Sequence, residues 1–123
     1  MYAWRSDGSF IYATPSYPFP NMDRYFQEND YAKKAMETYA ITIAELHNAG
    51  FVHGDPVFAN FLYDSDKNNV LLIDLDNLRY FPRHGRKFHE YRRREIEKIR
   101  VKAGRHFDVI ENMYKKMLMC EVL

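Results

Sequence analysis

The chain has 123 residues, of which 46% are hydrophobic and 16% aromatic, and its formal net charge is only +1. This composition excludes an intrinsically disordered chain and fits one domain with one modest core. The single cysteine, Cys120, excludes an internal disulfide, and no apolar run reaches the ~20 residues of a membrane-spanning helix. Residues 1–8 show no signal-peptide pattern. We therefore expect a cytoplasmic, single-domain protein.

The first predicted element is a strand over residues 9–14. The turn signal Asp7-Gly8 precedes it, so residues 2–5 are expected to form the other strand of a hairpin. Prolines 15, 18 and 20 then predict an extended connection, because each fixes its own backbone and restricts the residue before it. Asn21 is expected to cap a short helix that runs to Gln27.

The clearest predicted element is a long helix that Asn29 or Asp30 can cap. Apolar residues recur along it at three- and four-residue steps and predict one buried face: Ala32, Met36, Tyr39, Ile43 and Leu46. Gly50 is expected to end this helix as a residue with a left-handed backbone.

Three short strands are predicted next, over residues 51–53, 60–63 and 70–73. Residues 64–69, Asp-Ser-Asp-Lys-Asn-Asn, join the last two strands as a hairpin turn. Two helices follow, roughly over residues 86–102 and 105–121, and Gly104 separates them. The expected fold class is α+β, mainly helical with short β-hairpins.

Residues suited to chemistry gather around the two loops of this region. His53-Gly54-Asp55 follows a buried strand, Asn60 is expected to open the next strand, and Asp74 is expected to end that strand's partner. The hairpin would therefore make Asn60 and Asp74 neighbours, with Asp55 facing the same cleft. Mg²⁺ in phosphoryl transfer prefers carboxylate, amide and phosphate oxygens. A separate carboxylate must accept or orient the proton of the attacking hydroxyl.

Any one of these residues alone would be an ordinary turn or cap residue, so the hypothesis depends on the joint pattern. His-x-Asp-x-x-x-x-Asn, followed by a hydrophobic strand that ends in Asp, resembles the catalytic and metal loops of the protein-kinase-like fold. Residues 46–55, 60–62 and 72–76 are most similar to the lipopolysaccharide core kinases of the Kdo/WaaP family, which phosphorylate inner-core sugars. That family has Asp where protein kinases have the Gly of Asp-Phe-Gly, and Asp76 occupies this position.

The resemblance implies the C-terminal lobe of a kinase-like fold that uses ATP and Mg²⁺ to phosphorylate a hydroxyl of a lipopolysaccharide core sugar. It implies Asp55 as the catalytic base and His53 as the residue that braces the catalytic loop. Asn60 and Asp74 would bind the cofactor as Mg²⁺ ligands, and Asp76 would support them or contact a second metal. Residues 1–17 would be a remnant hairpin and hinge, residues 18–103 the catalytic and metal loops, and residues 104–123 a C-terminal helix.

A complete kinase also has a Gly-rich phosphate loop and a Lys paired with a helix Glu, and nothing before Phe10 supplies these. We therefore expect a fragment, a truncated gene or a degenerate relative. By itself it should have little or no kinase activity, because positioning and charge neutralisation supply nearly all of the catalysis. Whether the chain is an enzyme stays open. The alternative is a non-catalytic kinase remnant or a binding module for an anionic partner.

The segment of residues 79–105 carries eight Arg and three Lys against three Glu, a net charge of +8. The resemblance places this segment beside the acceptor site. It therefore implies a glycolipid acceptor, or an anionic face of the inner membrane, bound through Arg92, Arg93 and Arg94. A surface helix without a partner is the alternative. Nucleic acid is disfavoured because the segment has no recognisable binding module.

Two metal patterns are set aside. Asp64-x-Asp66-x-Asn68 resembles the start of a calcium loop, but Asn69 and Leu75 occupy the positions that need Gly and Glu. His84 and His89 lack the cysteine or carboxylate partners of a zinc site.

Overall fold

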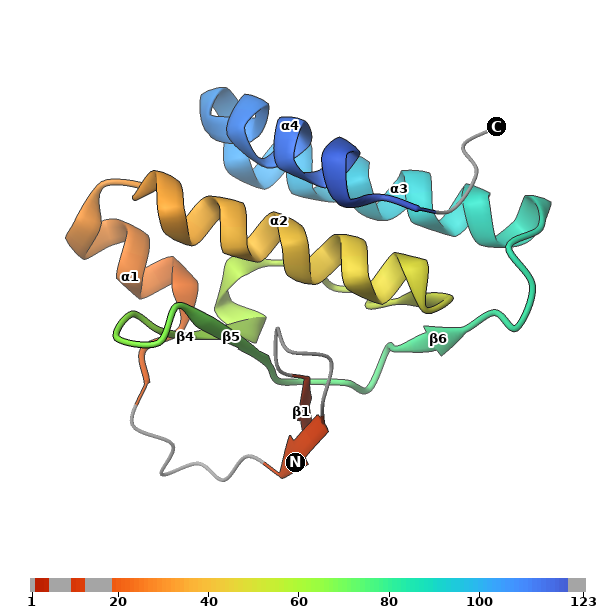
Figure 1. Cartoon of the computed structure of the whole chain (residues 1–123), viewed down its shortest axis with the longest axis horizontal. Helices are drawn as coiled ribbons and strands as arrows, with labels where there is room; N and C mark the ends of the chain where they lie inside the picture. Colours follow the sequence, from red (N-terminus) through yellow and green to blue (C-terminus); the bar gives the residue numbers. More distant parts are fainter. Residues whose placement is uncertain (1, 5–9, 13–18, 120–123) are drawn as a thin grey trace.

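The computed structural model describes residues 2–4, 10–12 and 19–119, and it has an α+β architecture (Figure 1). Helix α2 (Lys33–Asn48) lies in the middle of the molecule. Helices α3 (Arg86–Ala103) and α4 (Phe107–Met117) lie on one side of α2, and the short strands lie on the other. Helix α1 (Met22–Asn29) lies near the N-terminal end of α2. None of the helices in the described ranges is long and apolar enough to cross a membrane.

The described strands form three antiparallel pairs. Strand β1 (Tyr2–Trp4) pairs with β2 (Phe10–Tyr12), which confirms the predicted N-terminal hairpin, although its turn lies outside the described residues. Strand β4 (Phe61–Asp64) pairs with β5 (Asn69–Leu72), which confirms the second hairpin. Strand β3 (Phe51–Val52) pairs with β6 (Arg79–Tyr80), a pairing that we did not predict.

Helix α2 carries the centre of the hydrophobic core. Its predicted apolar face is buried, with Met36, Tyr39, Ile43 and Leu46 each no more than 3% exposed. The same core includes side chains of α1, the β4–β5 hairpin, α3 and α4. Burying each large apolar side chain contributes about 1.5–3 kcal/mol, so this face holds the helices and the hairpin together.

The ends of α1 and α2 only partly follow the prediction. Asn21 caps α1 as expected, because its Oδ1 accepts a hydrogen bond of 2.9 Å from Arg24 N. The prediction that Asn29 or Asp30 caps α2 is wrong. Asn29 is the last residue of α1, and its side chain bonds back to Tyr25 O. Asp30 has a left-handed backbone (φ 44°) and ends α1, so these polar residues complete the first helix and α2 begins after Ala32.

Glycine is required where α2 turns into β3. Gly50 has φ +88°, and a Cβ there would lie 2.5 Å from Phe81 O. Its amide donates to His47 O, so the chain leaves the helix at Gly50 as predicted. The C-terminal helices also follow the prediction closely. A short 3₁₀ turn, η2 (Gly104–His106), separates α3 from α4. Helix α4 ends at Met117, earlier than expected.

Candidate functional site

The loop that follows β3, residues 53–57, is named the catalytic loop after the kinase sequence pattern that it resembles. Gly54 has φ +93°, and a Cβ there would lie 2.6 Å from Asn77 O, so only glycine lets the segment of residues 74–78 pack against this loop. The catalytic loop runs into a 3₁₀ turn, η1 (Phe58–Asn60), and then into β4. Asn60 therefore ends a 3₁₀ turn, whereas we had expected it to open the strand.

His53 connects the two segments that the sequence pattern selects. Its side chain is fully buried. Its Nδ1 accepts a hydrogen bond of 3.2 Å from Asp55 N, and its Nε2 lies 3.4 Å from Ile73 O. His53 thus contacts the residue before Asp74 and the backbone of Asp55 at the same time.

Asn60 contacts Asp55 directly. Its Nδ2 donates to Asp55 O at 2.9 Å and to Asp55 Oδ2 at 3.1 Å. Its backbone carbonyl accepts a hydrogen bond of 2.9 Å from Ile73 N. The hairpin thus places Asp74 one residue beyond the partner of Asn60, whereas the two residues are fourteen positions apart in the sequence.

The acidic residues of the expected metal loop are exposed. Strand β5 ends at Leu72, so Asp74 follows the strand by two residues and does not end it. Asp74 has a left-handed backbone (φ 57°). Asp76 lines a polar cavity of about 370 Å³ together with Gly54, Arg79 and Lys98. Among the described residues, no group of three or more His, Cys, Asp or Glu side chains is arranged to hold a metal ion.

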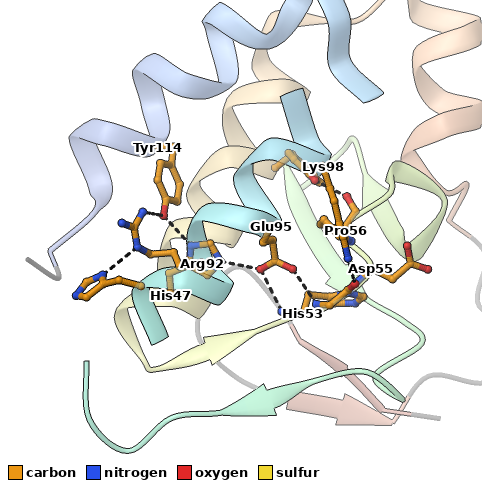
Figure 2. Close-up of polar contacts among 11 residues, drawn as sticks. His47, His53, Asp55, Pro56, Arg92, Glu95, Lys98 and Tyr114 are labelled. Carbon is orange, nitrogen blue, oxygen red and sulfur yellow. Dashed lines mark hydrogen bonds and ion pairs between the residues drawn. The ribbon is translucent and has the colours of Figure 1, made fainter. Parts of the chain in front are cut away.

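Glu95 of α3 is a site residue that the sequence reasoning missed (Figure 2). The residue is 2% exposed, and its carboxylate points from α3 into the catalytic loop. Oε2 accepts from His53 N at 3.1 Å, and Oε1 accepts from Gly54 N at 2.8 Å. Glu95 lies three residues after the buried Arg92 and four before the buried Ile99, and it lies seven residues, about two helical turns, after the buried Phe88. This periodicity is the sequence signal that could have predicted that Glu95 is buried.

The charge of Glu95 is stabilised in spite of its burial. Burial by itself raises the pKa of a carboxyl group. Here the hydrogen bond and charge of His47, together with the Gly54 and His53 amides, outweigh burial and lower the pKa of Glu95. The carboxylate is therefore ionised at neutral pH and can hold both amides of the catalytic loop.

A buried chain of hydrogen bonds continues from Glu95 to α4 (Figure 2). His47 Nε2 lies 2.7 Å from Glu95 Oε2, and His47 Nδ1 lies 2.7 Å from the Tyr114 hydroxyl. Arg92 Nη1 donates to the same hydroxyl at 3.2 Å, and Arg92 Nε donates to His89 Nδ1 at 3.3 Å. The catalytic loop is thus tied through side chains to helices α2, α3 and α4.

The position of Arg92 corrects one expectation. Arg92 is only 3% exposed, whereas Arg93 and Arg94 are exposed. Three consecutive helical residues span about 200° of the helix, so they cannot share one surface. Arg92 lies on the buried face of α3 and is not available to an anionic partner.

Two further side chains hold the carbonyl groups of the catalytic loop. The Tyr39 hydroxyl of α2 donates to Pro56 O at 2.5 Å, and Lys98 Nζ of α3 donates to Gly54 O at 2.9 Å. The loop is therefore fixed on its N–H side by Glu95 and on its C=O side by Tyr39 and Lys98. Such anchoring restricts the positions that the intervening residue, Asp55, can adopt.

Comparison with known proteins gives one match. The model of the family described as "Lipopolysaccharide kinase (Kdo/WaaP) family" matches residues 17–89, which is more than half of the chain. No curated protein and no solved structure matches the chain. The matched range includes His53, Asp55, Asn60 and Asp74, and it ends before Glu95.

Proposed function

Because the chain belongs to the lipopolysaccharide kinase (Kdo/WaaP) family, we propose that it provides the base and the Mg²⁺ ligands for transfer of the γ-phosphoryl group of ATP to a hydroxyl of a lipopolysaccharide core sugar. The observation that carries this proposal is the double hydrogen bond from Asn60 Nδ2 to the backbone and carboxylate of Asp55. It joins the candidate base to a candidate metal ligand, and Ile73 joins both to Asp74 through the backbone.

In this proposal Asp55 is the base. Asn60 binds only its Oδ2 atom, so Oδ1 can accept the proton of the acceptor hydroxyl or orient it. His53 Nδ1 accepts a hydrogen bond from Asp55 N, and this bond helps to set the direction of the Asp55 side chain. Glu95, Tyr39 and Lys98 hold the surrounding backbone, so the carboxylate does not have to be positioned anew in each reaction.

The donor set of this site fits Mg²⁺. Bound with nucleotide, Mg²⁺ would neutralise phosphate charge, and it would need only one or two carboxylates besides water and phosphate. Asn60 would offer Oδ1, since its Nδ2 already binds Asp55. Asp74 would offer its exposed carboxylate, and Asp76 would support it or contact a second ion.

We extend the proposal to the whole chain as the C-terminal lobe of a kinase-like fold. Residues 1–17 would provide the last hairpin and the hinge, residues 18–103 the two loops, and residues 104–123 the C-terminal helix. The charge of +8 over residues 79–105 supports a peripheral position at an anionic inner-membrane surface. Of the three consecutive arginines, Arg93 and Arg94 would take part.

The test is a titration of Mn²⁺ into the ¹⁵N-labelled chain in the presence of ATP, followed by paramagnetic broadening of backbone amide signals. We expect broadening centred on Asn60, Ile73 and Asp74. Asp74→Asn should remove it, and asparagine tolerates the left-handed backbone at this position. Asp66→Asn is the matched control, because Asp66 is an exposed carboxylate in the turn at the opposite end of the hairpin. Unchanged broadening in Asp74→Asn would disprove the metal site.

A further inference from the structure

A groove opens beside Asp55 on the α3 side of the catalytic loop. Its volume is about 450 Å³, which falls within the range of small-molecule sites. The loop contributes Asp55 and Val57, and α3 contributes chiefly Arg94, Lys98, Val101 and Lys102. Four of these six residues lie beyond the part of the chain that matches the family.

The cations of the groove form a regular row. Arg94, Lys98 and Lys102 are spaced four residues apart, so they lie on one face of α3 with about 6 Å of helix rise between neighbours. Arg94 also forms an exposed ion pair with Glu90. Glu97, the acidic residue of α3 in this groove, is paired with Arg100 at 3.3 Å. The row therefore keeps an excess of positive charge next to Asp55.

Lys98 is the member of the row closest to the catalytic loop. Its Nζ donates to Gly54 O at 2.9 Å (Figure 2). Lys98 also lines the same groove as Asp55. An ammonium group has three protons, so Lys98 can bind the loop and still donate to a ligand. The catalytic loop itself carries no Lys or Arg between His53 and Asn60. The positive charge at this place thus comes from α3.

We propose that this groove recognises a phosphate monoester already present on the acceptor, while the hydroxyl to be phosphorylated faces Asp55. A phosphate monoester carries about 1.5–2 negative charges at neutral pH and offers three acceptor oxygens. Lys98 and Lys102 supply ammonium donors, and Arg94 supplies a planar donor pair that suits phosphate. Val57 and Val101, the latter 73% exposed, provide an apolar wall for the C–H face of a sugar ring. The inference rests on the proposed function where it assigns the hydroxyl to Asp55.

The experiment measures binding by NMR, without nucleotide or metal. Glucose 6-phosphate is titrated into the ¹⁵N-labelled 123-residue chain, with glucose as the neutral probe and inorganic phosphate as the bare anion. We expect saturable shifts at Val57, Lys98 and Val101 with both phosphates and none with glucose. Lys98→Gln and Lys102→Gln should each weaken binding about fivefold, as expected for one exposed ion pair.

Lys87→Gln is the matched control, because Lys87 is an exposed lysine on the same helix outside the groove. It should leave the affinity unchanged at 0.15 M salt, where the screening length is about 8 Å. Lys102→Gln leaves the bond from Lys98 to the loop intact, so its effect cannot come from loop disruption. Equal weakening by Lys87→Gln, or equal binding of glucose, would overturn the proposal.

Two further arms separate the alternatives. Vesicles of phosphatidylcholine with phosphatidic acid carry the phosphate monoester on a lipid. Loss of vesicle binding in Lys102→Gln would indicate a lipid-borne phosphate, and unchanged vesicle binding would assign the groove to a soluble sugar phosphate. Phosphate binding should also persist in Asp74→Asn. That variant removes the proposed metal ligand, so failure of the groove and failure of the proposed kinase function give different results.

Discussion

Removing the Glu95 carboxylate should destabilise the protein and loosen the catalytic loop. The carboxylate accepts three hydrogen bonds, from His47 Nε2 at 2.7 Å, His53 N at 3.1 Å and Gly54 N at 2.8 Å. Glu95→Ala leaves these three donors buried without an acceptor. Breaking a buried hydrogen-bonded charge pair costs about 3–5 kcal/mol, a large part of the 5–15 kcal/mol that stabilises a typical domain.

Glu95→Gln refines this expectation. The amide oxygen can take the place of Oε2 and keep the bonds to His47 and His53, while the amide nitrogen then faces the Gly54 amide. Because these two N–H groups cannot bond to each other, the free energy of unfolding should fall by about 1–3 kcal/mol. Glu97→Gln is the matched control on the same helix. Its ion pair with Arg100 is more than half exposed on both sides, so its loss should cost no more than about 1 kcal/mol.

The assay is urea unfolding followed by circular dichroism, with hydrogen exchange to locate the effect. With a slope of about 1–3 kcal/mol per molar urea, Glu95→Ala should lower the midpoint by more than ~1 M. The His53 and Gly54 amides should both exchange faster in Glu95→Ala. In Glu95→Gln only the Gly54 amide should exchange faster, and in Glu97→Gln both rates should be unchanged. A Glu95→Ala variant as stable as Glu97→Gln, with slow exchange at both amides, would refute the reasoning.

The pH dependence has a defined sign. The pKa of Glu95 is lower in the folded protein than the ordinary value of a glutamate side chain, 4.5. The stabilisation from its charge is therefore complete above about pH 4.5 and is lost as the pH falls through the folded-state pKa. The stability difference between the wild type and Glu95→Gln should shrink over the same interval. A constant difference down to pH 3 would show that the charge of Glu95 contributes nothing.

Three further predictions test other parts of the structure. Gly54→Ala should destabilise by more than ~1 kcal/mol, because the backbone is left-handed and the new Cβ would meet Asn77 O, whereas Gly85→Ala, with open space around it, should cost less in the same unfolding assay. Burial and the charges of Arg92 and Arg93 lower the pKa of His89 below 6.5. The free energy of unfolding should therefore fall as the pH drops from 6.5 toward the pKa of His89 in the folded protein, and His89→Gln should flatten this part of the stability–pH profile. The double change Arg93→Gln and Arg94→Gln should reduce the fraction of protein that sediments with anionic vesicles at low salt and should have no effect at 1 M salt. Equal sedimentation of the wild type and the double variant at low salt would contradict the membrane proposal.

The sequence alone determined the elements whose signals are local. The apolar period of Met36, Tyr39 and Ile43 defined the buried face of α2, because a helix repeats its environment every three or four residues. The left-handed position of Gly50 followed from the same local logic. The spacing from Asn60 to Asp74 predicted that these two residues lie close together, because a hairpin turn brings residues fourteen positions apart back toward each other.

Local sequence signals failed where a residue type suits two structural roles. The polar side chains of Asn29 and Asp30 are equally suited to end one helix and to cap the next. The choice depends on the left-handed backbone that joins α1 to α2 and on how the two helices pack. Likewise, the two-residue strands β3 and β6 are too short to show a period of their own. Their pairing depends on the path of the intervening chain, which packs against Gly54 at Asn77.

Only the tertiary structure decided which charged side chains serve the site. The helical period of the buried positions in α3 can indicate that Glu95 is buried, but it does not show which backbone groups Glu95 binds. Glu95 and Lys98 lie more than forty positions from the His53 and Gly54 backbone groups that they bind. The rotation of α3 against α2 turns Arg92 and Glu95 inward and leaves Arg94, Lys98 and Lys102 around the groove beside Asp55. The composition shows that this segment is positively charged, but it does not show in which direction the charged side chains point. Helix packing decides that direction, because it buries the face of α3 that carries Phe88 and Ile99.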